Sequence, residues 1–498
     1  MLPARRAPSL VGPTRLRALA EEHDVDEVGW DAPSLPLLWR YNQHYFDDLS
    51  AADAESRRHW HCALIDRWLA DNPPGRGTAF APYPTSLRMV NWIKAFLGDL
   101  EPAPVWLDSL ALQARWLSRH LEWHLLGNHL FANAKALVYA GLFFDGPQAQ
   151  AWLQRGLSIL QRELPEQVLR DGGHFERSPM YHALALEDVL DLMNAIRTLG
   201  PADPRVKSMQ VQLAVVAASM LHWLRCMTAP DGTPTRFNDS ADGIAPVLPE
   251  LERYAAALGV TAPMPAAEGV NQLRDSGYTV MARAGAQAWL DTAPIGPDYL
   301  PGHAHADTLS YELYVHGKAL VVNRGTSVYG DGARRQTERG TAAHSTLQLD
   351  DLDSSEVWSG FRVGRRARPG PVEAKGWEVS CSHDGYSHLP GHPIHERSWS
   401  LGIGGLVVHD RVVSNRAREG VVRHHLAPGL QLQPDLLPGR WLVRDAAGHQ
   451  VALAEVATGS VEVEPWDHAL AFGKLAQAQT LRVQTSGGQA VLRWHWKR

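Results

Sequence analysis

The chain has 498 residues, a net charge of −6 and only three cysteines, which lie far apart. A chain of this length exceeds one ordinary hydrophobic core, so two large domains are expected. The negative charge and the lack of a basic run exclude a typical nucleic-acid-binding protein. The cysteine spacing excludes a disulfide framework and a thiolate metal site. Tryptophan is abundant, with 18 residues; most are expected in the core, although Trp also stacks on sugar rings.

The N-terminal segment has two early arginines but no apolar run of the length found in signal peptides. No stretch reaches the ~18 apolar residues that a membrane span requires. We therefore expect no membrane span and, by default, a cytoplasmic protein. The oligomeric state is left open.

Residues 1 to about 265 are expected to be helical. Apolar residues recur at helical spacing in segments such as WHCALIDRWLADNP, AQAWLQRGLSILQREL and VKSMQVQLAVVAASMLHWLRCM. Two loops between the helices, RDGGHFERSP and APDGTPTRFNDS, repeat an Asp-Gly turn followed by polar residues. Repeated helical pairs with such loops at one end predict an α/α toroid, an incomplete helical barrel.

The sequence changes character near Pro263, and residues 264–275 are the expected linker. From Ser276 onward short alternating segments predict an antiparallel β-sandwich. In LSYELYV, alternation predicts a half-buried strand, and His316-Gly317 then predicts a two-residue hairpin turn. The predicted fold is therefore multidomain α + β: a toroid over 1–265 and a sandwich over 266–498.

Two clusters with chemical potential lie in the helical half. Gly127-Asn128-His129 stands where one long helix gives way to another, and a Gly-Asn pair at such a boundary is, by itself, most simply a helix C-cap. The segment from Asp171 to His182 gathers two histidines, two acids, an arginine and Tyr181 in one loop. Dense polar loops are often functional, although Ser178-Pro179 also fits an N-cap followed by a helical proline.

Two further clusters lie in the sandwich half. In Gly302-His303-Ala-His305-Ala-Asp307, residues two apart share a side of an extended segment. Two histidines and a carboxylate on one side fit either metal ligation or acid–base catalysis. His344, in RGTAAHSTL, precedes a strand and is by itself best explained as structural, but it is a plausible third ligand beside His303 and His305.

Several blocks, taken in order, resemble those of heparinase II/III-type polysaccharide lyases. They are LLWRYNQHYFDDL, NHLFANAKALVYAGLFF, DGGHFERSPMYH, GHAHADTLSYELYVHGKALVVNRGTSVYG and ERGTAAHSTLQLDD. The resemblance implies a helical toroid followed by a β-sandwich. It implies a carbon–oxygen lyase acting on an acidic, uronic-acid-containing polysaccharide or oligosaccharide. Because many such relatives are exported, it also implies a periplasmic location as the alternative to a cytoplasmic one.

The resemblance also implies roles for single residues. Asn128 and His129 match the position that neutralises the substrate carboxylate, Tyr181 matches the catalytic tyrosine, and His303 matches the catalytic histidine. His305 and His344 match positions that bind a structural zinc ion, and no other cofactor is implied. The third ligand is typically acidic, whereas this chain has Asn323 there, and a neutral amide is a poorer cation ligand.

β-Elimination explains why such residues are needed. A base must remove the C5 proton beside a uronate carboxylate, and an acid must protonate the leaving oxygen at C4. Tyr181 could do both if the two groups lie on one face of the sugar ring; otherwise His303 is the base and Tyr181 the acid. Candidate substrate-binding residues are His174, Arg177, Arg236, Arg339 and Tyr329.

Two alternatives remain at this level. A glycoside hydrolase needs two carboxylates flanking the scissile bond, for which Glu176 and Asp239 are the best pair. A non-catalytic glycan-binding or accessory factor of polysaccharide biosynthesis would bind sugar without turnover.

Overall fold

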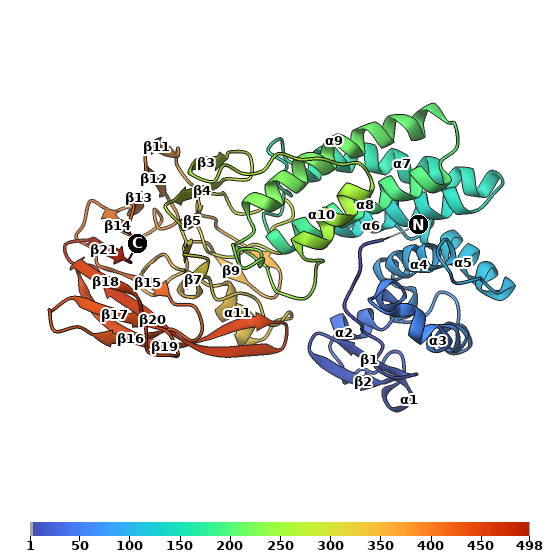
Figure 1. The fold of residues 1–498 in the computed structure, drawn as a ribbon, viewed down its shortest axis with the longest axis horizontal. Coiled ribbons are helices and arrows are strands. Elements are labelled where there is room, and N and C mark those ends of the chain that lie inside the picture. The colour runs from blue at the N-terminus through green and yellow to red at the C-terminus, as the bar shows by residue number, and fades with distance from the viewer. Residues whose placement is uncertain (1–2, 498) are drawn as a thin grey trace. The chain divides into compact units, whose positions relative to one another are not determined.

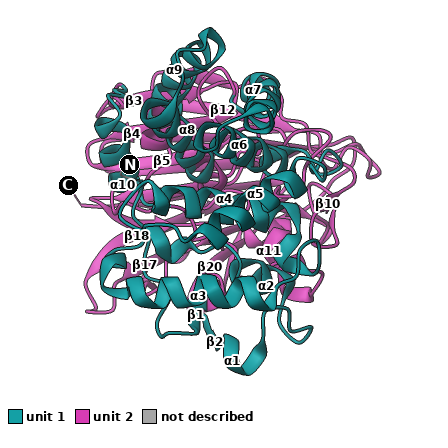
Figure 2. Ribbon diagram, turned by 90° about the vertical axis from the view of Figure 1, so that its right-hand side faces the viewer, with its two compact units in different colours: residues 1–168, 183–221, 246–262 teal, residues 169–182, 222–245, 263–498 magenta. Residues whose placement is uncertain are grey.

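The computed structural model describes residues 3–497. It contains two compact units, coloured separately in Figure 2. Unit 1 comprises Met1–Val168, Ala183–Leu221 and Pro246–Ala262, and unit 2 comprises Leu169–His182, His222–Ala245 and Pro263–Arg498. Unit 1 is mainly helical and unit 2 mainly β-sheet, and the two helix-linking segments 169–182 and 222–245 belong with the sheets.

Helices dominate the first part of the chain, as the apolar spacing predicts (Figure 1). They are α1 (Val25–Val28), α2 (Leu37–Asn42), α3 (Arg58–Asp71), α4 (Pro82–Phe96), α5 (Pro104–Leu117), α6 (Gly127–Phe143), α7 (Pro147–Gln167), α8 (Pro179–Leu199), α9 (Pro204–Cys226) and α10 (Leu248–Ala257). Five of these ranges begin with proline, whose fixed φ and missing N–H suit the first helical turn.

Helices α6 and α7 form a tightly packed hairpin. A Cβ atom on Gly141 of α6 would lie 2.5 Å from the backbone nitrogen of Leu153 in α7. A Cβ atom on Gly156 of α7 would lie 2.7 Å from the carbonyl oxygen of Ala134 in α6. Because both contacts involve backbone atoms, the two helices approach this closely only with glycine at both positions.

The two similar loops seen in the sequence adopt the same turn. In the first, Leu169 N donates to Gly173 O, and Gly172 N donates to Leu169 O. In the second, Ala229 N donates to Thr233 O, and Gly232 N donates to Ala229 O. The internal repeat predicted from the two Asp-Gly turns is thus confirmed at the level of hydrogen bonding.

The N-terminal region departs from the all-helical expectation. β1 (Arg15–Ala18) and β2 (Glu21–Asp24) form a two-stranded antiparallel hairpin there. The expected linker is also shorter than predicted, because β3 (Gly269–Leu273) already belongs to a sheet.

Unit 2 contains three larger antiparallel sheets and a small hairpin. A five-stranded meander runs β3, β4 (Tyr278–Arg283), β5 (Ala286–Asp291), β6 (Tyr311–Val315) and β7 (Lys318–Val321). A four-stranded sheet has the order β19 (Ser460–Ala471), β20 (Lys474–Gln484), β15 (Gly420–His425) and β8 (Leu347–Leu349). β9 (Val357–Trp358) pairs with β10 (Arg362–Val363), and helix α11 spans Ala333–Arg339.

The third sheet has eight strands. Its order is β11 (Glu373–Lys375), β12 (Glu378–His383), β13 (Ile394–Leu401), β14 (Gly405–Val413), β21 (Gln489–His495), β18 (Gln450–Thr458), β17 (Arg440–Arg444) and β16 (Gln431–Pro434). Apolar side chains from all three larger sheets form one buried cluster that includes Trp399 and Trp494.

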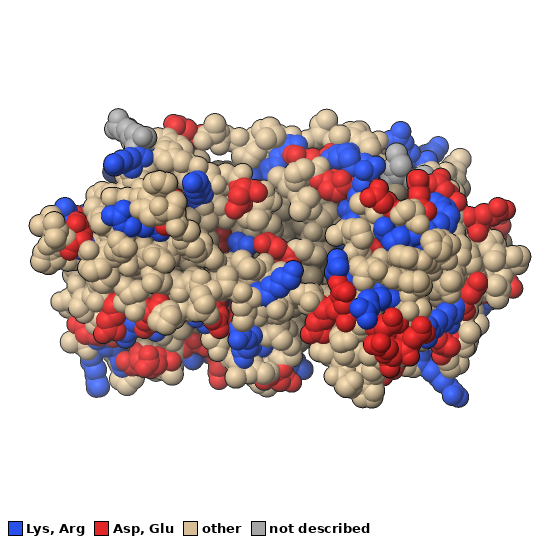
Figure 3. Space-filling view, turned by 60° about the horizontal axis from the view of Figure 1, so that its bottom comes forward, with Lys and Arg blue, Asp and Glu red and all other residues tan. Residues whose placement is uncertain are grey.

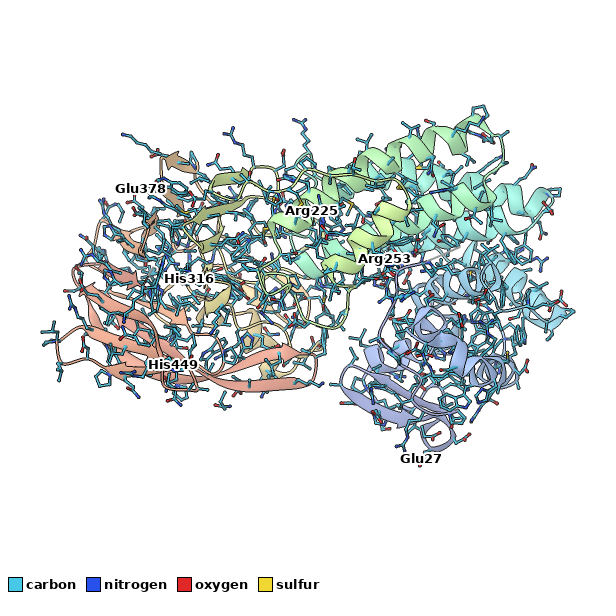
Figure 4. The ribbon with its side chains drawn as sticks, in the orientation of Figure 1. Glu27, Arg225, Arg253, His316, Glu378 and His449 are labelled. Atoms are coloured by element: carbon cyan, nitrogen blue, oxygen red, sulfur yellow. The ribbon has the colours of Figure 1, made fainter. Side chains whose placement is uncertain are left out.

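Strand β6 confirms one prediction and contradicts another. Val315 pairs with Lys318, so His316 and Gly317, both with positive φ, form the predicted two-residue turn; His316 is labelled in Figure 4. The strand is not half-buried, however. Tyr311 and Leu313 enter the main core, while Tyr314 on the other face packs in a second core with Trp223 and Trp289. A second apolar layer therefore covers the face expected to meet solvent.

Most tryptophans are buried, as expected; among residues 3–497 the exposed ones are Trp123 and Trp358. Acidic and basic side chains are interspersed on the face shown in Figure 3. No helix in the described range is long and apolar enough to cross a membrane.

Candidate active site

Tyr181 and His303 lie together in unit 2. Tyr181 stands in the first turn of α8, and His303 lies in the loop before β6. Their ring centroids are 3.9 Å apart with an interplanar angle of 40°. The Tyr181 hydroxyl is 3.0 Å from that of Tyr329. The structure thus brings together the two residues expected to exchange protons with substrate.

Hydrogen bonds between three loops fix this arrangement. Asn238 Nδ2 donates to the carbonyl of Arg177 (3.0 Å), and Ser178 Oγ donates to that of Asp239 (2.5 Å). His305 N donates to Asn238 Oδ1 (3.0 Å). Arg177 and Asn238 both have positive φ, which is uncommon outside glycine and is often found at functional loops. The second repeated loop therefore binds the GHAHAD segment directly, and the first repeated loop binds the second.

Asp239 is the hub of the site and is completely buried. His303 Nδ1 lies 3.0 Å from its Oδ2, and His305 Nε2 lies 2.8 Å from its Oδ1. Arg335 binds both carboxylate oxygens, with 2.7 Å between Nη2 and Oδ2. Burial alone would raise the pKa of Asp239, but Arg335 and the two histidine hydrogen bonds lower this pKa well below the usual range. Asp239 is therefore an anion.

An anionic acceptor sets the histidine tautomers. Because Asp239 can only accept, Nδ1 of His303 and Nε2 of His305 must carry protons. Nε2 of His303 is then the nitrogen with a free lone pair, and the His303 side chain keeps 15% of its exposure. His303 is thus arranged as a base with a fixed orientation.

Tyr181 is arranged as an acid. Burial, the neighbouring Tyr329 and the charge of Asp239 together raise the pKa of Tyr181 well above its ordinary value. The phenol therefore keeps its proton at neutral pH. Tyr329 and Phe361 add aromatic surface beside His303, with ring centroids 6.1 and 5.8 Å from its ring.

In unit 1, Asn128 and His129 occupy the first turn of α6. Helix α5 ends at Leu117 and α6 begins at Gly127, so the C-cap interpretation of Gly127-Asn128 is wrong. His129 Nδ1 lies 3.0 Å from Glu122 Oε1, and its ring lies 4.5 Å from that of Tyr83. Unpaired amides at a helix N-terminus favour anions, so this placement suits a carboxylate ligand.

The candidate metal ligands are grouped, but the set is incomplete. The rings of His305 and His344 are 5.3 Å apart, and His344 Nδ1 lies 3.3 Å from Asn323 Oδ1. His305 Nδ1 and His344 Nε2 are buried without hydrogen-bond partners, as two metal-binding nitrogens would be. Within residues 3–497, however, no three His, Cys, Asp or Glu side chains lie close enough to hold a metal. The donors therefore fit zinc only in part.

The remaining substrate-binding candidates are largely used by the protein itself. Arg339 is fully buried and donates to the carbonyls of Ala304, Ser359 and Arg362. Arg177 Nε donates to Ser276 O (3.0 Å), and Arg236 pairs with Asp242 (2.7 Å). His174 is buried, and burial lowers its pKa to about 3. These hydrogen bonds and the ion pair favour structural roles for the three arginines, whereas Tyr329 borders the Tyr181 hydroxyl.

Arg335 was not predicted from the sequence, and Asp239 was considered only as one of the two carboxylates of a hydrolase. Asp239 lies in the second repeated loop, so the repeat was a usable signal for it. Arg335 lies in DGARRQTERG, a segment without pattern, and its role depends on tertiary contacts alone.

Comparison with known proteins agrees with this architecture. The family models for the heparinase II/III N-terminus and the heparinase II/III-like C-terminal region match residues 51–258 and 265–495. A heparin-sulfate lyase of Bacteroides stercoris is 28% identical over 385 residues, covering 67% of this chain and 57% of that protein. FtsZ-localized protein C of Caulobacter vibrioides is 28% identical over 411 residues, covering 78% and 67%. The chain matches about half the length of the curated heparin-sulfate lyases.

The crystal structure of heparinase III shares the fold. The TM-score is 0.72 at 18% identity, and the match covers 91% of this chain and 76% of that chain. The predicted order of a helical toroid followed by an antiparallel β-sandwich is thereby confirmed. Two family models in the expected order, together spanning nearly the whole sequence, show that the chain belongs to the heparinase II/III family.

Proposed function

We propose that the protein is a polysaccharide lyase that cleaves a uronic-acid-containing glycan by β-elimination. The observation that carries the proposal is the contact between the Tyr181 phenol ring and the His303 imidazole, with Asp239 holding that imidazole. The names of the heparin-sulfate lyases among its relatives support the same reaction class.

The two residues divide the proton transfers. Nε2 of His303 removes the C5 proton, and the electron pair of that C–H bond forms the C4–C5 double bond. The C4–O bond breaks, and the Tyr181 hydroxyl protonates the departing oxygen. The raised pKa of Tyr181 supports the acid role over the base role. General acid–base groups each contribute about 10²–10⁴-fold.

Asn128 and His129 are assigned to the substrate carboxylate. The C5 proton is barely acidic while the carboxylate is charged, so donors that stabilise the developing enolate lower the barrier. Each well-placed donor of this kind contributes about 3–4 kcal/mol. Their position in the first turn of α6 adds backbone N–H groups of the right polarity.

A hydrolase is less well supported. Inverting and retaining hydrolases need one carboxylic acid that protonates the leaving group and a second accessible carboxylate. Asp239 is fully buried, anionic and bound on both oxygens by Arg335, so it can neither donate a proton nor reach a sugar.

For a metal, the proposal is limited to structure. His305 and His344 would supply two nitrogens and Asn323 an amide oxygen, and the ion would brace the loop that carries His303. Elemental analysis of the purified protein, repeated after dialysis against a chelator, tests whether zinc is retained.

The reaction can be tested directly, because its product carries a conjugated double bond. Heparan sulfate, chondroitin, hyaluronan and alginate are incubated with the wild type and with Tyr181→Phe. We expect new ultraviolet absorbance with at least one polymer, reduced about 10²–10⁴-fold by loss of the hydroxyl, with an unchanged unfolding curve. Reducing ends formed without absorbance would contradict the lyase proposal.

A non-catalytic glycan-binding or accessory role is the second candidate. It is favoured by the similarity to FtsZ-localized protein C, whose name describes a location and no cleavage. Tight glycan binding that Tyr181→Phe leaves unchanged, together with no turnover of any polymer, would support this role.

A further inference from the structure

The β9–β10 hairpin presents exposed aromatic and basic side chains beside His303. Trp358 is 54% exposed and Phe361 is 41% exposed, although both are large apolar residues. Arg362 is also exposed, and within residues 3–497 its guanidinium makes no ion pair. Its neighbours differ, since Arg365 binds the carbonyl of Gly385 and Arg366 binds Asp298. Exposed aromatic groups beside an unpaired charge mark a binding surface.

The hairpin is close to the reacting groups. The Phe361 ring centroid lies 5.8 Å from that of His303 and 5.2 Å from that of Tyr329. Phe361 lies in the turn of the hairpin, between Trp358 and Arg362. A ligand that covers the exposed part of Phe361 therefore adjoins the Tyr181–His303 pair.

The hairpin is also held rigidly. Arg335 Nε donates to Gly360 O (3.0 Å), while Arg339 donates to Ser359 O (3.0 Å) and Arg362 O (3.2 Å). Asp331 accepts from Ser359 Oγ and Gly360 N, both at 2.6 Å. A surface ordered before binding loses little conformational entropy when a ligand arrives.

We propose that Trp358, Phe361 and Arg362 form a subsite for an anionic sugar residue of the substrate chain. The proposal rests on the glycan-cleaving function above and names a subsite for it. Trp358 and Arg362 are directly opposed cross-strand partners, so their side chains project on the same face, about 5 Å apart at Cβ. One pyranose ring can stack on Trp358 while its carboxylate or sulfate reaches Arg362. Phe361 continues this surface toward His303.

The test compares substitutions on the hairpin with a matched one outside it. Steady-state kinetics use the best polymer of the substrate panel with Trp358→Ala, Trp358→Phe, Arg362→Gln and the control Arg368→Gln. Arg368 is exposed, and in the part of the chain that the structure describes only its backbone groups make hydrogen bonds. Unfolding curves confirm that each variant is folded.

We expect Trp358→Ala and Arg362→Gln each to raise KM about tenfold, because each removes a contact made to bound substrate and transition state alike. Trp358→Phe retains a stacking surface and should recover most of the loss. Arg362→Gln should also weaken the dependence of KM on salt, whereas Arg368→Gln should leave both properties at the wild-type level.

Some outcomes overturn the subsite alone. If the wild type cleaves a polymer and both hairpin variants keep KM within about twofold of it, the subsite is refuted and the lyase proposal stands. The same holds if Arg368→Gln raises KM as much as Arg362→Gln does.

A different outcome separates the two proposals. If no polymer is cleaved, the lyase proposal fails, and calorimetric titration with a heparan sulfate oligosaccharide decides the subsite. Binding weakened by Arg362→Gln but not by Arg368→Gln supports it, and binding that is absent or equal in all variants refutes it.

Discussion

Unit 2 contains two buried aspartates with nearly the same partners, Asp239 and Asp410. Each binds an arginine through both oxygens and accepts a histidine hydrogen bond. For Asp410 the partners are Arg397, at 2.7 and 3.0 Å, and His395, at 2.7 Å. In both cases burial alone would raise the pKa of the aspartate, and the arginine and histidine partners lower it.

The two clusters differ in the hydrogen bonds of the histidine nitrogens that point away from the aspartate. His395 Nδ1 lies 3.1 Å from His383 Nε2, and His383 Nδ1 accepts from the backbone N–H of Gly385 (3.1 Å). Each ring nitrogen of His395 and His383 therefore makes a hydrogen bond, and both rings are buried. Within residues 3–497, by contrast, Nε2 of His303 makes no hydrogen bond, and its ring is partly exposed. An Asp–His–Arg cluster is therefore no sign of catalysis by itself; the open nitrogen is what the proposed base role of His303 requires.

The largest expected difference in activity between the two clusters follows from removing one imidazole from each. His303→Gln should lower kcat about 10²–10⁴-fold, because it removes the proposed general base, and should change stability little. His383→Gln is the matched change in the closed cluster and should leave the activity per folded molecule unchanged. Initial rates of absorbance increase, normalised to the folded fraction, measure both. Equal losses in the two variants would show that the clusters are functionally alike.

Replacing the aspartate of each cluster is expected to have a smaller effect on activity. Asp239→Asn removes the charge that fixes the His303 tautomer, and we expect kcat to fall about 10–100-fold in the folded fraction. Asp410→Asn should leave kcat unchanged. Both changes leave a buried arginine unpaired and should cost about 3–5 kcal/mol in the free energy of unfolding. Urea unfolding and kinetics on the same samples separate the two effects, and a matching fall in kcat for Asp410→Asn would contradict the assignment.

The smallest effect concerns pH. Burial first, then the nearby His395 and Arg397, lowers the pKa of His383 well below its ordinary value of about 6.5. Below that pH the unfolded chain binds a proton that the folded chain does not, so the folded state loses stability as pH falls. His383→Gln should reduce this slope by about 1.4 kcal/mol per pH unit. Urea midpoints at pH 5, 6 and 7 measure it; identical slopes would show that His383 titrates when folded.

Local patterns in the sequence predicted much of this structure. The change from helix to strand near residue 265, the His316-Gly317 turn and the repeated Asp-Gly turns all depend on neighbouring residues, so they could be predicted. The spacing of His303 and His305 predicted that they share a side, and both contact Asp239.

The features that were predicted wrongly, or not at all, depend on contacts between distant segments. Strand β6 was expected to be half-buried, but the layer with Trp223 covers its second face. The Gly127-Asn128 pair starts a helix, and its residue types alone do not distinguish a start from an end. Arg335 lies 96 residues from Asp239, and no local spacing rule relates them.

Arg335 donates hydrogen bonds both to the Asp239 carboxylate and to the Gly360 carbonyl. The hydrogen bonds that Arg335 and Arg339 donate to the hairpin go to main-chain oxygens, which any amino acid would supply. The one hairpin side chain that Arg335 also contacts within residues 3–497 is Phe361, whose ring centroid lies 5.3 Å from the guanidinium carbon. Side chains at positions 358 and 362 can therefore change without loosening the hydrogen bonds that hold the hairpin beside His303. With the proposed subsite and reaction, such a scaffold would allow new sugar preferences to evolve, or to be engineered, while the reaction chemistry stays intact.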